Sequence, residues 1–258
     1  MRWALNTYRT AQNWTLEETL EMAKKTGYHG VEWLMDFQQG HGIEWDLPRQ
    51  EWSAKREAIR RSGLQSASLT SCQVFHHPDP EQRAESVRRV RRVIEMAEYF
   101  EAPMVRVLGD RFTPETREQV IQWVAEALRE LGEYAASRGI LLNLEMHGSF
   151  TDPEAALAVV QRVNLPNVGF VFNGQFVGCE PGGSIAPLFE RIAPYVRSVH
   201  THQVEDPTVF GFYQQMFRWL RRSGFEGWIS NECAYTGPDP EKVLRLYVAL
   251  FEALSADS

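Results

Sequence analysis

The feature that most constrains the fold is an alternation of short apolar runs with amphipathic helical stretches along the whole chain. Apolar runs bounded by turn residues are typical of strands buried on both faces. Eight such runs occur, at 3–6, 31–33, 64–70, 104–108, 140–144, 168–172, 196–199 and 228–231. Strands that alternate with helices form a parallel sheet, so the pattern predicts an α/β protein, a single (β/α)8 TIM barrel domain over residues 1–258.

Local capping signals mark where the intervening helices begin. Thr15 and Glu18 form a capping-box pattern, and a proline, in most cases preceded by Asp, stands at the start of several other helical stretches. We expect helices at 15–25, from Pro48 to before Gly63, from Pro80, at 114–137, from Thr151, at 185–192, at 212–223 and from Asp239. In the last helix, the spacing predicts an inward stripe of Val243, Tyr247, Leu250 and Leu254.

Composition narrows the classes of partner. The net charge of -7 opposes nucleic-acid binding, which draws most of its affinity from Lys and Arg. No apolar run approaches the length of a membrane span, and the start of the chain lacks a secretory signal, so we expect a cytoplasmic protein with a small-molecule partner and no membrane contact. Three cysteines without a CxxC pair indicate neither a disulfide framework nor a structural zinc site: Cys72, Cys179 and Cys233.

Polar side chains stand where four of the apolar runs end. Glu145 follows the fifth run, Asn173 the sixth, and Glu232 the eighth, while His200 follows the seventh. Because catalytic groups of such barrels gather at the carboxyl ends of the strands, we expect these four to meet. Their oxygen and nitrogen atoms suit a divalent metal, Mn²⁺, Mg²⁺, Co²⁺ or Zn²⁺. A cluster of structural polar groups at the barrel rim is the alternative.

Several short motifs, taken in order, resemble the xylose isomerase-like superfamily, the sugar phosphate isomerases and epimerases. The motifs are Asn6-Thr7-Tyr8, Gly27 to Glu32, Val105 to Gly109, Leu144 to Gly148, Ser198 to His202 and Gly224 to Glu232. They extend over essentially the whole chain. The resemblance implies an enzyme of carbohydrate metabolism that acts on a carbohydrate-like small molecule, and homo-oligomers are common in the family.

The resemblance also implies roles for particular residues. In this family, Glu, Asp, His and Glu at the ends of strands five to eight hold one divalent metal, and the two glutamates act as acid and base. Glu145 and Glu232 would therefore be metal ligands and catalytic residues, and His200 a metal ligand. Asn173 would be the fourth ligand, but it departs from the usual Asp and brings no negative charge. His202 departs as well, since the family often has Lys there.

Other residues near strand ends are candidates for substrate binding. Glu32 and Arg106 could orient Glu145 or a sugar hydroxyl, or form an internal salt bridge. His147, His202 and the loop residue His76 are further candidates, although loop histidines are often only solvated. Aromatic residues that could wall a sugar pocket, or pack in the core, are Trp14, Trp33, Phe75 and Phe176.

The chemistry of such a site is proton transfer next to a carbonyl. A metal polarises an α-hydroxyketone, a glutamate removes the adjacent proton to give a cis-enediolate, and the proton returns at the other carbon or on the other face. The product is an isomer or an epimer. Loss of a β-hydroxyl would instead make a dehydratase of an inositol-like or shikimate-like ketone. A non-catalytic sugar-binding barrel and a three-metal DNA-repair endonuclease are the remaining alternatives, and the negative charge opposes the latter.

Overall fold

The computed structural model describes residues 1–174, 184–233 and 237–256, and its centre is a closed barrel of eight parallel strands in sequence order. The strands are β1 (Arg2–Asn6), β2 (Gly30–Leu34), β3 (Gln65–Thr70), β4 (Met104–Leu108), β5 (Leu141–Glu145), β6 (Val168–Asn173), β7 (Val196–Thr201) and β8 (Trp228–Asn231). β8 pairs with β1 and closes the barrel. The predicted TIM barrel is therefore confirmed.

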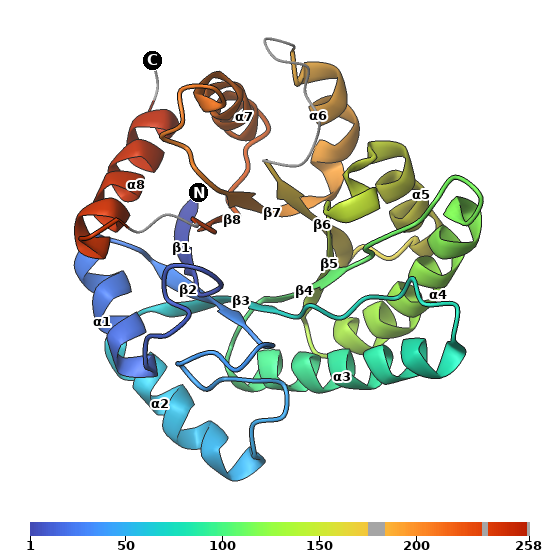
Figure 1. Ribbon diagram of the computed structural model, residues 1–258, viewed down its shortest axis with the longest axis horizontal. Coiled ribbons are helices and arrows are strands. Elements are labelled where there is room, and N and C mark those ends of the chain that lie inside the picture. The colour runs from blue at the N-terminus through green and yellow to red at the C-terminus, as the bar shows by residue number, and fades with distance from the viewer. Residues whose placement is uncertain (175–183, 234–236, 257–258) are drawn as a thin grey trace.

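Within the described ranges, eight α-helices surround the strands (Figure 1). They are α1 (Leu16–Thr26), α2 (Trp52–Ser62), α3 (Pro80–Tyr99), α4 (Arg117–Ala136), α5 (Pro153–Val163), α6 (Ala186–Ile192), α7 (Phe210–Arg222) and α8 (Pro240–Ser255). Short 3-10 turns lie at Arg49–Glu51, Gly148–Thr151 and Ala193–Tyr195. None of the described helices combines the length and apolar character needed to cross a membrane.

The helix starts follow the local capping chemistry. Thr15 caps α1 in a complete capping box, and Asp152 caps α5 through its side chain. Gly27 ends α1 in the left-handed conformation that glycine adopts without strain. The predicted inward stripe of α8 is only partly right. Tyr247 is buried as expected, and Val243, Leu250 and Leu254 are half-buried and pack against the core, but Leu244, Val248 and Phe251, which were not predicted, are buried more deeply.

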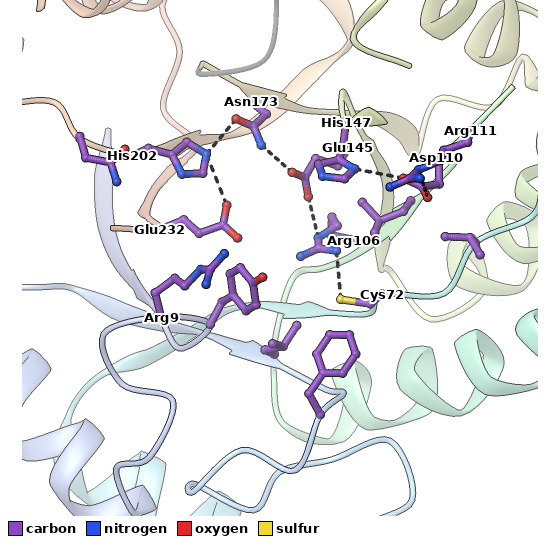
Figure 2. A pocket seen from close by; sticks show the side chains of 16 residues that line it. Arg9, Cys72, Arg106, Asp110, Arg111, Glu145, His147, Asn173, His202 and Glu232 are labelled. Atoms are coloured by element: carbon purple, nitrogen blue, oxygen red, sulfur yellow. Dashed lines mark hydrogen bonds and ion pairs between the residues drawn. The ribbon is translucent and has the colours of Figure 1, made fainter. Parts of the chain in front are cut away.

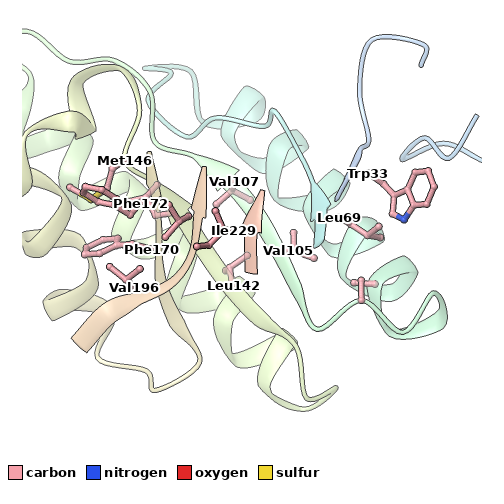
Figure 3. Close-up of a cluster of buried hydrophobic side chains, with 14 of the residues drawn as sticks. Trp33, Leu69, Val105, Val107, Leu142, Met146, Phe170, Phe172, Val196 and Ile229 are labelled. Carbon is pink, nitrogen blue, oxygen red and sulfur yellow. The ribbon is translucent and has the colours of Figure 1, made fainter. Parts of the chain in front are cut away.

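The main apolar core lies between the strands and the helices (Figure 3). Alternate strand residues face outward into this layer, as Val105 and Val107 do in β4 and Ile229 does in β8. The residues between them face the barrel interior. A small cluster of Ala4, Ala67, Met104 and Trp228 is separate from the outer core. Some of the buried polar residues at the other interior positions, among them Glu32, Arg106, Glu145 and His200, form the site described next.

Candidate active site

A cavity of about 540 Å³ opens at the carboxyl ends of the strands. Figure 2 shows side chains from several strand ends and loops converging on it. Its polar lining includes Arg9, Cys72, Arg106, Asp110, Arg111, Glu145, His147, Asn173, His202, Gln203 and Glu232. The cavity therefore lies where a barrel of this class is expected to carry its chemistry.

Three of the predicted metal ligands come together at this cavity. Glu145 ends β5, His200 lies in β7, and Glu232 directly follows β8. One ligand atom from each lies within 4.8 Å of the other two, and all three residues are buried. His200 Nδ1 is 3.2 Å from Glu232 Oε2 and 3.7 Å from Glu145 Oε1. This nitrogen is buried and has no hydrogen-bond partner among the described residues.

The other ring nitrogen of His200 is fixed by Glu32, which lies in β2. His200 Nε2 is 2.8 Å from Glu32 Oε1. The same oxygen accepts hydrogen bonds from Asn6 Nδ2 and Thr70 Oγ1, both at 2.8 Å, and Ser230 Oγ donates to Glu32 Oε2 at 2.6 Å. Burial alone would raise the pKa of Glu32, but His200, Ser230 and the charge of Arg106 outweigh it and lower the pKa to about 2.

This arrangement favours a positive charge at His200 Nδ1. Burial opposes a charged imidazole, yet Glu32 and Glu145 raise the pKa of His200 well above its ordinary value. A proton or a metal ion could supply that charge. Since Nε2 is bonded to a carboxylate and Nδ1 faces two more, the ring is held as metal-binding histidines are. The described residues thus fit a divalent ion.

Asn173, the predicted fourth ligand, lies beside this triad. Its Nδ2 donates to Glu145 Oε1 at 2.7 Å, and its Oδ1 is 3.0 Å from His202 Nε2. A half-turn of the amide would exchange the two atoms and put Oδ1 next to the Glu145 carboxylate. Burial lowers the pKa of His202, although the charge of Glu232 partly opposes this. In this arrangement, the amide oxygen of Asn173 can accept a hydrogen bond from His202 Nε2–H.

Arg106 from β4 pairs with Glu145. Its Nε lies 2.9 Å from Glu145 Oε2, and both side chains are buried. Burial would raise the pKa of Glu145, but the charges of Arg106 and His200 and the hydrogen bond from Asn173 lower it below its ordinary value. Arg106 also donates to the carbonyl oxygen of Ser71 at 3.0 Å. The structure thus shows the predicted internal salt bridge of Arg106, and its role as a substrate contact stays a prediction, since Arg106 also lines the cavity.

His147 lines the cavity next to Asp110. His147 Nδ1 is 3.2 Å from Asp110 Oδ1, and this hydrogen bond raises the pKa of His147 despite its partial burial. The two residues meet because Gly148 has a φ of +57° and packs against the Asp110 backbone, where a Cβ would lie 2.7 Å from its carbonyl oxygen. His147 is therefore placed as a candidate substrate contact.

The structure does not bring the remaining predicted residues to the cavity lining. Trp33 is fully buried in the outer core and donates to Ser66 Oγ at 3.1 Å. His76 stacks on His77 with ring centroids 4.5 Å apart, and neither lines the cavity. Phe75 is buried, and Trp14 is half-buried and packs against the core. Phe176 and Cys179 lie outside the described residues.

Sequence reasoning missed several lining residues that lie on loops. Arg9 follows β1, Asp110 and Arg111 follow β4, and Phe37 follows β2. Phe37 is 65% exposed and has a φ of +73°, and the next residue, Gln38, has a φ of +54°. Two consecutive non-glycine residues in the left-handed region are uncommon and mark a strained loop. The only signal in the sequence is that these residues closely follow strands.

Comparison with known proteins agrees with this geometry. The sequence model of the family described as xylose isomerase-like TIM barrel matches residues 20–253. No curated protein matches the chain. Among solved structures, 3-keto-D-glucoside 4-epimerase from E. coli has a TM-score of 0.81 at 16% identity and covers 98% of this chain and 99% of its own.

Two further structures bear on the fold. The IolI protein with a bound zinc atom has a TM-score of 0.76 at 18% identity, covering 99% of this chain and 98% of its own. A probable 3-DHS dehydratase from Bacillus anthracis, involved in petrobactin synthesis, has a TM-score of 0.70 at 13% identity and covers 100% of both chains. At such identities, these likenesses establish the shared barrel and leave the substrate undetermined.

Proposed function

Since the chain belongs to the xylose isomerase-like TIM barrel family, we propose that it is a divalent-metal-dependent isomerase or epimerase of a sugar, polyol or related keto compound. The observation that carries the proposal is His200 Nδ1, buried without a hydrogen-bond partner among the described residues and facing Glu145 and Glu232. Epimerases among the structures of the same fold support it.

Glu145, Asn173, His200 and Glu232 would hold the ion, which is Mn²⁺, Mg²⁺, Co²⁺ or Zn²⁺. When bound, it polarises the carbonyl of the substrate and lowers the pKa of the neighbouring C–H. Glu32 keeps the His200 ring oriented for this purpose by holding Nε2. Four strands thus supply the proposed metal ligands, and a fifth strand, β2, supplies Glu32, which orients the His200 ring.

Glu145 and Glu232 would move the proton. They extend from β5 and β8 toward the same cavity, and both line it (Figure 2). One carboxylate removes the proton next to the carbonyl and gives a cis-enediolate, and either carboxylate returns it. Return at the other carbon is isomerisation, and return on the other face is epimerisation. Arg106 keeps Glu145 ionised, which a carboxylate must be before it can act as a base.

Exchange of the substrate proton with solvent tests the proposal. The protein, loaded in turn with each metal, is incubated in D₂O with ketoses such as D-fructose, D-tagatose and D-psicose, and deuterium incorporation is followed by NMR. We expect metal-dependent exchange that Glu145→Gln and Glu232→Gln each abolish, because each change removes a base and a ligand charge. Glu130→Gln, the same change on the surface of α4, is the matched control. Exchange that survives in either pocket variant would refute its acid-base role.

A dehydratase is the second candidate, favoured by the likeness to the probable dehydratase. The first proton abstraction would be the same, and loss of a β-hydroxyl would follow. Only this reaction gives a conjugated product, so ultraviolet absorbance in the same incubations with ketoinositols and shikimate-like ketones separates the two. Metal binding without exchange or absorbance change would instead favour a non-catalytic sugar-binding barrel.

A further inference from the structure

Arg9 presents a charged group to the cavity from the loop between β1 and α1. The residue is exposed and lines the cavity, and Figure 2 shows its guanidinium extending toward Glu232. Its guanidinium carbon lies 4.4 Å from the centre of the Tyr8 ring. Stacking on the ring leaves the N–H edge of the guanidinium available for a planar acceptor.

The loop that carries Arg9 is held at both ends. Thr7 Oγ1 accepts a hydrogen bond from the Leu34 N–H at 2.9 Å, and Thr10 Oγ1 donates to the Cys233 carbonyl at 3.0 Å. Both threonines are buried. Between them, the Tyr8 N–H donates to Asn6 Oδ1 at 2.8 Å. The backbone that carries Arg9 is therefore positioned in advance, which reduces the entropy cost of binding a ligand.

The charges around Arg9 leave it without a counter-charge. Arg106 pairs with Glu145 at 2.9 Å, and Asp110 lies 3.6 Å from Arg111. The divalent ion required by the proposed function, together with Arg106, would offset the charges of three buried carboxylates: Glu32, Glu145 and Glu232. Arg9 makes no ion pair with any residue in the described ranges. An uncompensated cation in the cavity of a chain with net charge -7 indicates an anionic ligand.

We propose that Arg9 binds an anionic group of the substrate, so that the substrate is a sugar acid or sugar phosphate rather than a neutral sugar. This inference rests on the proposed function, because the charge of the ion enters the balance. Arginine binds carboxylate and phosphate oxygens through two parallel N–H bonds. Since β1 pairs with β8, the anionic group lies on the Glu232 side of the cavity.

Binding of unreactive polyols tests this assignment without any turnover. Calorimetry would compare sorbitol, gluconate and sorbitol 6-phosphate, with the protein loaded with Mn²⁺ and after treatment with chelator. We expect one of the two anions to bind at least about tenfold more tightly than sorbitol, as a charge-assisted contact implies. The tighter anion identifies the group as a carboxylate or a phosphate. Arg9→Gln should abolish the preference, and Arg61→Gln, on the exposed face of α2, should retain it.

Equal affinity for all three polyols, no measurable binding of either anion, or a preference that survives in Arg9→Gln would overturn the assignment. Failure of the Arg9 assignment can be distinguished from failure of the proposed isomerase function. Metal-dependent exchange on neutral ketoses with no anion preference would remove only the role of Arg9. An Arg9-dependent anion preference without proton exchange on any compound would refute the isomerase proposal and support the anion-binding role of Arg9.

Discussion

Replacing Glu32 by Gln should weaken metal binding although Glu32 is not a proposed ligand. The carboxylate lies behind His200 and bonds its Nε2 at 2.8 Å, while Nδ1 faces the ion site. A charged acceptor on Nε2–H makes Nδ1 a better electron donor, and an amide oxygen in the same place does so much less. The change keeps the size of the side chain and removes one charge.

The magnitude follows from the contacts of Glu32. Loss of a carboxylate behind a metal-binding histidine typically lowers metal affinity about 10- to 100-fold, or roughly 1.4–2.8 kcal/mol. The effects of Glu32→Gln on the free energy of unfolding partly cancel. Three hydrogen bonds to Oε1 would become neutral, each weaker by about 1 kcal/mol, whereas the desolvation penalty of a buried charge would disappear. Metal affinity is therefore the cleaner measurement.

Competition against a chromophoric chelator measures the affinity for Zn²⁺ and Mn²⁺ in each variant, and urea unfolding of the same samples reports stability. Asp36→Asn is the matched control, because Asp36 is also a buried carboxylate near the end of β2. It accepts a hydrogen bond from the Cys72 N–H at 2.8 Å and has no contact with His200. The control should change metal affinity by less than about threefold. Unchanged affinity in Glu32→Gln, or equal losses in both variants, would refute the reasoning.

Two further predictions concern charge. Asn173→Asp should tighten Mn²⁺ binding about tenfold or more in calorimetry, because it adds a negative charge 2.7 Å from Glu145. Equal or weaker binding would mean that residue 173 is not a ligand. Burial and the charge of Lys55 lower the pKa of His41 to about 3. The contribution of the neutral His41 ring to the free energy of unfolding is therefore complete above pH 6.5 and is lost as the pH falls toward 3. Urea unfolding should show that the free energy of unfolding falls by about 2 kcal/mol from pH 7 to pH 5. His41→Asn should remove this fall, and asparagine is chosen because it keeps an acceptor for the Ile43 N–H. An equal fall in the variant would contradict the assignment to His41.

The elements of the barrel could be predicted because their signals are local. The capping box at Thr15 and the Asp-Pro pairs before α5 and α8 fix helix starts through contacts within one turn. The meeting of Glu145, His200 and Glu232 could be predicted from topology, since parallel strands in one barrel end at the same face. The extent of the domain, residues 1–258, stays a prediction.

Side-chain direction and loop geometry explain the rest. Glu32 and Trp33 are consecutive in β2, so they point to opposite faces and cannot both reach the barrel interior. Glu32 faces inward, and Trp33 packs in the outer core. Arg9 and Asp110 lie on loops, where no periodicity links sequence to direction. Their positions depend on hydrogen bonds to distant residues, such as that from Thr10 to Cys233.

The strained loop after β2 has a consequence for engineering the protein. Phe37 and Gln38 adopt backbone angles that cost on the order of 1 kcal/mol or more each, while the Phe37 ring stays exposed at the cavity. Gln38→Asn would relieve part of the strain and leave the ring in place, because asparagine tolerates the left-handed region. Phe37→Asn would relieve strain but remove the ring. Selection for thermostability alone would favour both substitutions, and only selection that includes ligand binding would distinguish them.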